Sequence, residues 1–310
     1  MPSEKVAVLG AGLMGHGIAQ IFAAAGHEVA LYDTSAEILK TAPERIRAIF
    51  KLLDQDESLA SNVRLEADFD RAFADADLVV EAAPEKLPVK QEIFSRLEKA
   101  TRREAILASN TSALPITEIA RPVKTGDRVV GTHFWNPPHL IPLVEVVQAE
   151  RTSAATIAKT MAMLEAAGKS PVHVKRDVPG FIGNRLQHAL KREAIAIVAD
   201  GICDAETLDK VVKDGFGARL GILGPLEQSD LIGLNITLDV HATLLKHLNR
   251  DTEPHPYLVD KVRKGETGMK AGKGFMEWTP EEAAAVRERV NRQLVEAARA
   301  RAKARAKAKF

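Results

Sequence analysis

The sequence predicts an α/β protein: a doubly wound parallel sheet in the N-terminal part and a smaller, all-helical C-terminal domain. Between Val6 and Val174, short apolar runs alternate with stretches of helical periodicity, and a glycine-rich turn follows the first run. Strands that alternate with helices in this way form parallel sheets covered by helices. Beyond Asp177-Val178-Pro179-Gly180 the sequence contains long helical periods and no convincing strand. We therefore expect two domains, 1–178 and 179–310.

The period of the apolar residues defines the elements of the first domain. Continuous apolar runs are typical of buried strands, and apolar residues three or four positions apart indicate helices. Within the helix expected at 36–53, Thr41-Ala42-Pro43-Glu44 matches a capping box with proline in the first turn, so we expect the helix to restart there. Strands are expected at 6–9, 28–32, 76–82, 105–108, 128–134, 143–147 and 172–174, and further helices at 89–100 and 152–167.

The second domain is expected to be helical throughout. Helical periods cover 186–198, 205–212 and 232–248, and no internal repeat is evident. Thr279-Pro280-Glu281-Glu282 has the pattern of a capping box and predicts the start of the last helix.

Bulk properties restrict the class of protein. The chain of 310 residues is 45% apolar and 27% charged, which is ordinary for a soluble protein, and its net charge of +1 implies no nucleic-acid partner. Cys203 is the only cysteine, so no intrachain disulfide is possible. No signal peptide precedes the first strand and no apolar run spans a bilayer, so we expect a cytoplasmic protein without membrane contact. The basic stretch 299–309 is interpreted as a frayed, solvated helix end, and the alternative is a segment that binds an anionic partner.

A glycine frame organises the first domain. The segment VAVLGAGLMGHGIA (6–19) places Gly10, Gly12 and Gly15 in a G-x-G-x-x-G pattern between a strand and a helix. The glycines permit a tight turn, close approach of a pyrophosphate and close helix packing, and the helix N-terminus attracts phosphate. Asp33 ends the second strand, where a carboxylate accepts hydrogen bonds from ribose hydroxyls and repels a 2′-phosphate; this favours NAD over NADP. The alternatives are an ordinary glycine-rich turn and a solvated or capping carboxylate.

His133 and Glu145 are the best candidates for acid–base chemistry. Histidine exchanges protons near neutral pH, and a buried carboxylate fixes its tautomer and stabilises the imidazolium. Glu145 lies within Leu-Val-Glu-Val-Val, where it needs a partner if it is buried. The alternative is a structural histidine and an exposed glutamate.

Further polar residues are expected near this pair. Ser109-Asn110-Thr111-Ser112 follows a strand, and ligands bind at the carboxyl ends of strands in open α/β sheets, although such residues also cap helices. Asn184 lies just past the domain boundary, where it faces the cleft or caps a helix. No metal-ligand spacing and no G-x-S-x-G elbow is present, so metal and serine-hydrolase chemistry are not expected.

Taken together, these segments resemble the NAD-dependent L-3-hydroxyacyl-CoA dehydrogenases and their relatives that act on free hydroxy acids. The resemblance covers nearly the whole chain, and its middle segments are far more specific than the glycines. Its segments are VAVLGAGLMGHGIA (6–19), DLVVEAAPEKLPVK (77–90), SNTSALPI (109–116), THFWNPPHLIPLVEVV (132–147), DVPGFIGNRL (177–186) and KAGKGF (270–275).

The resemblance implies a role for each candidate residue. It implies a Rossmann-type domain, a helical domain through which two subunits dimerise, and catalysis between the two domains. His133 would be the base, Glu145 its orienting partner, and Ser112 and Asn184 the groups that hold substrate oxygens. The implied cofactor-binding residues are Gly10, Gly12, Leu13, Met14, Gly15, Asp33 and Asn110, with Glu85 and Lys90 near the nicotinamide ribose.

The implied reaction is hydride transfer from C3 of an L-3-hydroxyacyl-CoA to NAD, as in fatty acid metabolism. The alternative is the same chemistry on a small free hydroxy acid related to carnitine, gulonate or a pyridine carboxylate, with Arg219 or another cation holding the carboxylate. It is suggested by Pro43 and Glu44, which stand where CoA-using members carry lysines, by Met276 after KAGKGF and by the polar stretch 227–230.

Two other classes fit less well. A lysine-dependent β-hydroxyacid dehydrogenase requires a lysine that 181–190 lacks, and a non-enzymatic protein on this fold would be expected to lose the His133–Glu145 pair.

Overall fold

The computed structural model describes residues 3–308 and contains two compact units. The α/β unit consists of the residues up to Arg185 together with those from Val290 onward, and the helical unit of Leu186–Arg289. The predicted fold class, a Rossmann-like α/β sheet with a helical C-terminal domain, is confirmed. In this division the α/β unit extends to Arg185, past the boundary predicted after residue 178, and it also includes the last part of the final helix.

The α/β unit is built on one eight-stranded sheet with the order β3-β2-β1-β4-β5-β6-β7-β8. Strands β1 to β6 pair in parallel, whereas β7 runs antiparallel to β6, and β8 is parallel to β7. The edge strand β3 was not predicted, because none of its four residues, Val-Arg-Leu-Glu, is buried and the segment has no continuous apolar run. The strands are β1 Lys5–Leu9, β2 Glu28–Tyr32, β3 Val63–Glu66, β4 Leu78–Glu81, β5 Ile106–Ser109, β6 Val129–Phe134, β7 Leu143–Val147 and β8 Ser170–Val174.

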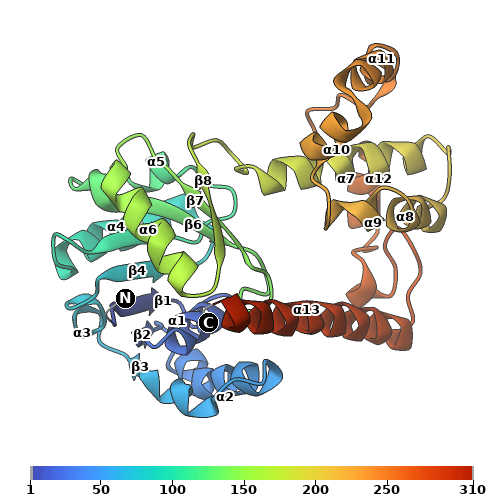
Figure 1. The fold of residues 1–310 in the computed structure, drawn as a ribbon. Coiled ribbons are helices and arrows are strands. Elements are labelled where there is room, and N and C mark those ends of the chain that lie inside the picture. Colours follow the sequence, from blue (N-terminus) through green and yellow to red (C-terminus); the bar gives the residue numbers. More distant parts are fainter. Residues whose placement is uncertain (1–2, 309–310) are drawn as a thin grey trace. The chain divides into compact units, whose positions relative to one another are not determined.

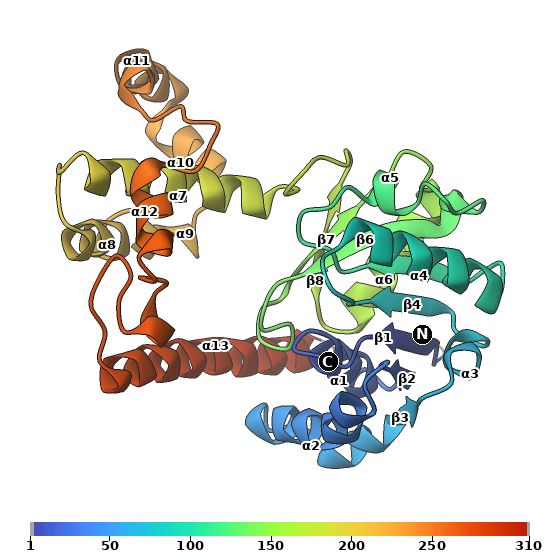
Figure 2. The same ribbon diagram turned by 180° about the vertical axis from the view of Figure 1, so that it is seen from behind.

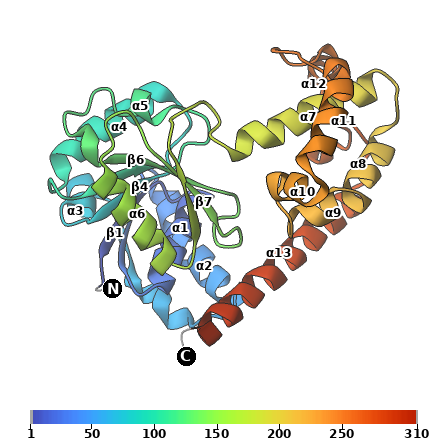
Figure 3. The same cartoon turned by 45° about the horizontal axis from the view of Figure 1, so that its top comes forward.

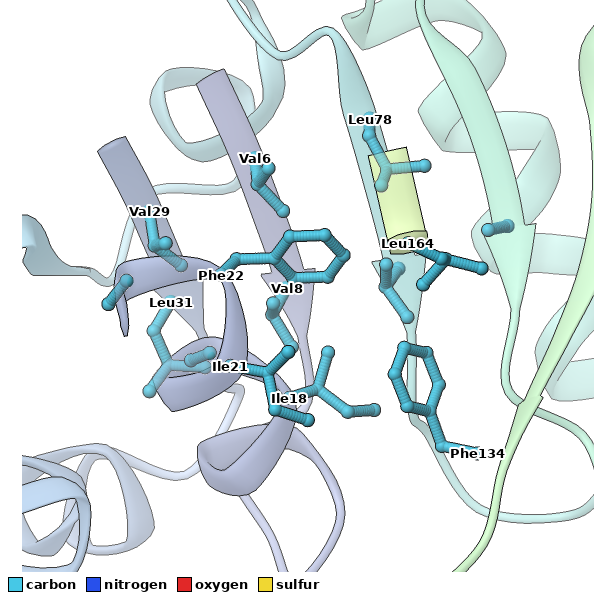
Figure 4. Packing of buried hydrophobic residues seen from close by; sticks show 14 of the residues in the cluster. Val6, Val8, Ile18, Ile21, Phe22, Val29, Leu31, Leu78, Phe134 and Leu164 are labelled. Carbon is cyan, nitrogen blue, oxygen red and sulfur yellow. The ribbon is translucent and has the colours of Figure 1, made fainter. Parts of the chain in front are cut away.

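Helices cover both faces of this sheet (Figures 1 and 2). Because successive residues of a strand point to opposite faces, Val6 and Val8 pack into one core, and Ala7 and Leu9 into the other. Figure 4 shows the first core, in which Phe22 packs with strand residues such as Val8. Helices α1 (Gly15–Ala24), α2 (Ala36–Leu52) and α6 (Ala154–Ala166) cover the first face; α3 (Phe69–Phe73), α4 (Leu87–Ala100) and α5 (Ile116–Ile119) cover the second.

Helix α2 does not restart at Pro43, contrary to the sequence-based expectation. It runs from Ala36 to Leu52 with Pro43 in its interior and is capped by Ser35, whose hydroxyl accepts a hydrogen bond from Ile38 N. Proline removes one backbone donor and crowds the preceding turn. The missing donor would have served the Leu39 carbonyl. Helix α2 nevertheless continues, because residues on both sides of Pro43, among them Leu39 and Ile46, pack into the core of the α/β unit.

The helical unit buries very little apolar side chain. Among residues 186–289, all of which the structure describes, only Ala196, Ala205 and Ala283 are buried apolar residues. The helix predicted at 232–248 is shorter, because Gly233 at φ +100° separates two helices. The helices are α7 (Gly183–Ala199), α8 (Ala205–Asp214), α9 (Gly217–Leu220), α10 (Pro225–Ile232), α11 (Leu234–Leu244), α12 (Pro256–Arg263) and the start of α13 (Pro280–Ala308) (Figure 3).

The predicted cap of the last helix is confirmed, since Thr279 and Glu282 exchange hydrogen bonds between side chain and backbone. Short 3₁₀ segments occur at Glu57–Asn62, Gly126–Arg128, Leu245–His247 and Met269–Ala271. Of the helices within 3–308, none is long and apolar enough to cross a membrane.

Candidate active site

The predicted site residues of the α/β unit gather where the sheet's parallel strands end. Gly10 follows β1, Asp33 follows β2 and Asn110 follows β5. Asn110 is tied to both neighbouring strand ends, because its backbone N–H donates to the Glu81 carbonyl and its side chain accepts from Phe134 N at 2.9 Å. This edge is where open α/β sheets bind ligands.

The glycine turn has the geometry that a dinucleotide requires. Gly10 adopts φ +97°, and a Cβ at Gly15 would lie 1.6 Å from the Gly10 carbonyl oxygen. A Cβ at Gly12 would meet no protein atom within 4 Å, so the space in front of it is open. Asp33 stabilises the turn by accepting a hydrogen bond from Ala11 N at 2.7 Å. The residues therefore fit a pyrophosphate at the start of α1.

The other two residues of the glycine frame differ in exposure. Leu13 is 67% exposed, whereas Met14, the N-cap residue of α1, packs against the core.

The antiparallel pairing of β6 with β7 places His133 directly opposite Glu145. His133 Nδ1 lies 2.8 Å from Glu145 Oε2, and both side chains are buried. The turn between the strands contains Asn136–Pro137 and reverses the chain. The structure thus brings together the two residues that the sequence singled out as an acid–base pair.

The start of α7 holds the second oxygen of Glu145. Glu145 Oε1 accepts hydrogen bonds from Ile182 N at 2.9 Å and from Gly183 N at 3.0 Å. Burial raises the pKa of Glu145, but the hydrogen bonds from His133, Gly183 and Ile182 together outweigh it, so its pKa lies below the ordinary value. Glu145 is therefore a carboxylate at neutral pH. These backbone donors could not be predicted from the sequence, because nothing in DVPGFIGNRL indicates which group accepts from them.

Trp135 is a further neighbour of the pair that the sequence analysis passed over. Its indole Nε1 lies 3.4 Å from Glu145 Oε2 and its ring packs 5.4 Å from that of His133. The indole also lies over Gly183, where a Cβ would come within 2.3 Å of Trp135 Cζ2. The available signal was its position two residues after His133, directly beyond the end of β6.

Ser112 and Asn184 are also brought together. Asn184 Nδ2 donates to the Ser112 carbonyl oxygen at 2.9 Å, which joins the loop after β5 to the first turn of α7 within the α/β unit. Glu85 orders the same loop by accepting from Thr111 Oγ1 at 2.5 Å and from Ser112 N at 2.9 Å. Desolvation raises the pKa of Glu85, but these bonds and the Lys90 charge bring it below its ordinary value.

Two family profiles cover almost the whole chain. That of the 3-hydroxyacyl-CoA dehydrogenase NAD-binding domain matches residues 5–178, and that of the C-terminal domain of the same enzymes matches residues 180–278. The chain belongs to the 3-hydroxyacyl-CoA dehydrogenase family. It is an oxidoreductase, and its cofactor is NAD.

Relatives in this family differ in substrate. The chain is 33% identical over 297 residues to a 5-formyl-3-hydroxy-2-methylpyridine 4-carboxylate 5-dehydrogenase of Mesorhizobium japonicum, covering 94% of this chain and 96% of the relative. It is 35% identical over 284 residues to a 3-hydroxybutyryl-CoA dehydrogenase of Clostridioides difficile, covering 88% and 99%. The crystal structure of a 5-formyl-3-hydroxy-2-methylpyridine 4-carboxylic acid 5-dehydrogenase, described as an NAD⁺-dependent dismutase, aligns with a TM-score of 0.88 at 32% sequence identity. The alignment covers 96% of this chain and 98% of the chain in that structure.

Lys90, which the resemblance places near the nicotinamide ribose, is fully buried. Lys90 Nζ lies 2.7 Å from Glu81 Oε1 and 3.5 Å from Glu85 Oε2, and Lys90 is 1% exposed. Ser109 Oγ donates to the other Glu81 oxygen at 2.6 Å. The sequence analysis gave Glu81 no role, although a glutamate that ends an apolar strand needs a buried partner.

Arg45 is tied to the glycine turn and is not a solvated helix charge. Its guanidinium donates to the Ala11 carbonyl at 2.9 Å and lies 3.3 Å from His16 Nδ1. Burial, the largest effect, and the Arg45 charge lower the pKa of His16, against an opposing hydrogen bond to Gly12. Arg45 thus stabilises the turn from behind. Within residues 3–308, no group of three His, Cys, Asp or Glu side chains is placed to hold a metal ion.

Proposed function

We propose that this family member oxidises a secondary hydroxyl group at C3 of a hydroxyacyl substrate, with His133 as the base and Glu145 as its orienting partner. The observation that carries the proposal is the buried 2.8 Å contact between His133 Nδ1 and Glu145 Oε2. Since the Glu145 carboxylate only accepts hydrogen bonds, His133 carries its proton on Nδ1, and the lone pair of Nε2 is free to take the hydroxyl proton. NAD, when bound, supplies the hydride acceptor.

The loop after β5 and the first turn of α7 supply the groups for the substrate oxygen. The hydroxyl of Ser112 and the side-chain amide of Asn184 are linked through the Ser112 carbonyl, so both are held near fixed positions. Donors fixed in this way polarise a carbonyl oxygen in the reverse reaction, in which protonated His133 returns its proton.

Glu85 is proposed to face the nicotinamide ribose, as the resemblance implies. Lys90 acts through it: because the Lys90 ammonium group is buried against Glu81 and Glu85, it positions Glu85 and does not contact the cofactor itself. Asn110 is proposed as a cofactor-side residue on the same edge of the sheet.

Two substrate classes are candidates, an L-3-hydroxyacyl-CoA of fatty acid metabolism and a small free hydroxy acid. The contacts of Arg45 favour the free acid, because this arginine of α2 binds the Ala11 and Ile38 carbonyls and is not displayed for CoA phosphates. The exposed cations of α2, Lys40, Arg47 and Lys51, are what a CoA thioester would have to use. The near full-length match to the pyridine carboxylate enzyme supports the free acid as well.

Two parallel assays, one for each substrate class, test the proposal. NADH consumption is followed by absorbance with acetoacetyl-CoA and with free acetoacetate, each also with NADPH. A rate with acetoacetyl-CoA no better than with the free acid excludes the CoA substrate, and a large preference for the thioester excludes the free acid. In the substrate class that reacts, His133→Ala is expected to retain NAD binding and lose about 10²–10⁴-fold in kcat; near-full activity of that variant would refute the role of His133.

The helical unit is proposed to form a homodimer, as the resemblance implies. The unit buries only alanines among its apolar residues, whereas leucines and isoleucines of α9 to α11 are widely exposed, with Ile222 at 87% and Leu226 at 81%. Apolar surface of this extent marks a protein interface. Light scattering coupled to size exclusion is expected to give twice the chain mass, and a monomer at micromolar concentration would contradict the proposal.

A further inference from the structure

The second half of α13 packs against the α/β unit through its arginines, beyond the last residue that either family profile covers. The contacted carbonyls lie at the end of α2, near the end of α6 and in the loop between β6 and β7. Side-chain cations are favourable at helix C-termini because the last carbonyls are unpaired. Arg299 donates to Leu52 O, Arg301 to Leu140 O and Arg305 to Glu165 O.

A cavity of about 180 Å³ lies beneath these arginines, entirely within the α/β unit. Gln20 of α1, His139 of the β6–β7 loop, and Arg301 and Arg305 of α13 are among the residues that line it. Lys169 is also in its wall and is only 6% exposed. Its ammonium group donates to the Pro138 and Ile141 carbonyls, which leaves the third of its N–H donors without a protein partner.

The positive charge around this cavity has no acidic counterpart. None of the described residues that line it is an aspartate or glutamate, and within residues 3–308 neither Lys169, Arg301 nor Arg305 forms an ion pair. Arg299, at the edge, is neutralised by Asp54 at 3.0 Å. A buried ammonium group next to two guanidinium groups is costly unless an anion is present.

The excess of positive charge contributes to lowered pKa values of Lys169 and His139. Burial, followed by the charges of Arg301 and Arg305, lowers the pKa of Lys169 to about 7. Burial, together with His16 and Lys169, lowers the pKa of His139 to about 4, so this wall of the cavity is neutral at pH 7. An anion in the cavity would restore the proton on Lys169.

We propose that the cavity between α13 and the α/β unit is a binding site for a small oxyanion, a phosphate or carboxylate group, held by Lys169 at its base and by Arg301 and Arg305 at its mouth. Guanidinium and ammonium donors without competing carboxylates are the chemistry that recognises such groups. Because Lys169 also holds the loop between β6 and β7, a bound anion would stabilise the connection between the strands that carry His133 and Glu145.

Inorganic phosphate is the first probe, with the full-length chain at about pH 7. For a dissociation constant on the order of 1 mM, about 20 mM phosphate is expected to raise Tm by about 3 °C over sodium chloride of equal ionic strength. Sulfate and acetate arms distinguish an oxyacid dianion from a carboxylate as the preferred ligand. Calorimetric titration measures the dissociation constant directly.

Variants locate the effect. Lys169→Met is expected to abolish the rise in Tm, whereas Lys303→Met, which removes an exposed lysine of the same helix, is expected to keep it. If Lys169→Met does not fold, the double variant Arg301→Gln/Arg305→Gln takes its place, with at least a tenfold loss of phosphate affinity expected. An equal Tm in phosphate and chloride, or a phosphate response that survives in Lys169→Met or in the double variant, would overturn the proposal.

Discussion

Replacing Glu145 by glutamine tests the proposed acid–base pair with little change of shape. In the native site each carboxylate oxygen has two neighbouring N–H donors: Oε1 faces Ile182 N and Gly183 N, and Oε2 faces His133 Nδ1 and Trp135 Nε1. A glutamine offers one acceptor oxygen and one NH₂ group. The backbone donors cannot change, so the amide oxygen stays toward α7 and the NH₂ group replaces Oε2.

This arrangement forces the wrong tautomer on His133. An NH₂ group facing Nδ1 requires Nδ1 to accept, so the proton moves to Nε2 and the base is lost. We expect kcat to fall about 10²–10⁴-fold with NAD affinity unchanged within about twofold. Steady-state NADH absorbance and calorimetric NAD titration measure the two quantities, and Glu150→Gln, at an exposed glutamate three residues after β7, is the matched control. Activity of Glu145→Gln within about threefold of the native enzyme would refute the reasoning.

Three further predictions concern the surroundings of the site. Trp135→Phe removes the indole N–H near the carboxylate but leaves the 2.8 Å contact between His133 and Glu145 in place; kcat should stay within about threefold of the native value in the NADH assay, and a loss of more than about tenfold would contradict this. Gly12→Ala should keep the native Tm and lose NAD affinity at least about tenfold, whereas Gly15→Ala should lower Tm itself, as measured by thermal unfolding and calorimetry; equal effects of both would be inconsistent with the geometry. Between pH 7 and 10, Lys169 is protonated in the unfolded chain but largely unprotonated in the folded protein, so the free energy of unfolding should rise with pH. In urea unfolding without phosphate, Lys169→Met should reduce this rise by roughly 3–4 kcal/mol. An unchanged dependence on pH in this variant would exclude the lowered pKa of Lys169.

Much of the α/β unit follows from local sequence. The apolar strand runs, the glycine turn and the cap at Thr279 depend on residues close together in the chain, and these features were predicted within a few residues. The errors have physical causes as well. Pro43 predicted a helix break, but α2 continues through it because residues on both sides, among them Leu39 and Ile46, pack into the core. Edge strand β3 has too little burial to leave an apolar signature.

The sequence also named the pair at the centre of the proposed reaction. His133 and Glu145 were chosen for their chemistry and their strand context, and antiparallel pairing of β6 with β7 puts them side by side. Their neighbours were not foreseeable in the same way. The N–H groups of Ile182 and Gly183 come from a segment 37 and 38 residues beyond Glu145. The resemblance placed Lys90 near the nicotinamide ribose, but the sequence did not indicate that Lys90 is buried against Glu81.

By itself, then, the sequence determined the fold class, the family and the glycine turn, and it singled out the two residues of the proposed acid–base pair, because strand periodicity, glycine spacing and side-chain chemistry are properties of short segments. Only the tertiary structure decided how Glu145 is held, that Arg45 supports the glycine turn, and that the basic end of α13 packs on the α/β unit, where Arg299 meets a carbonyl 247 residues away. Contacts between distant segments depend on which polar groups and apolar surfaces still lack a partner after the helices and strands have formed. The basic end of the chain, which the sequence led us to interpret as solvated, therefore contributes two arginines to a cavity whose wall includes the buried Lys169.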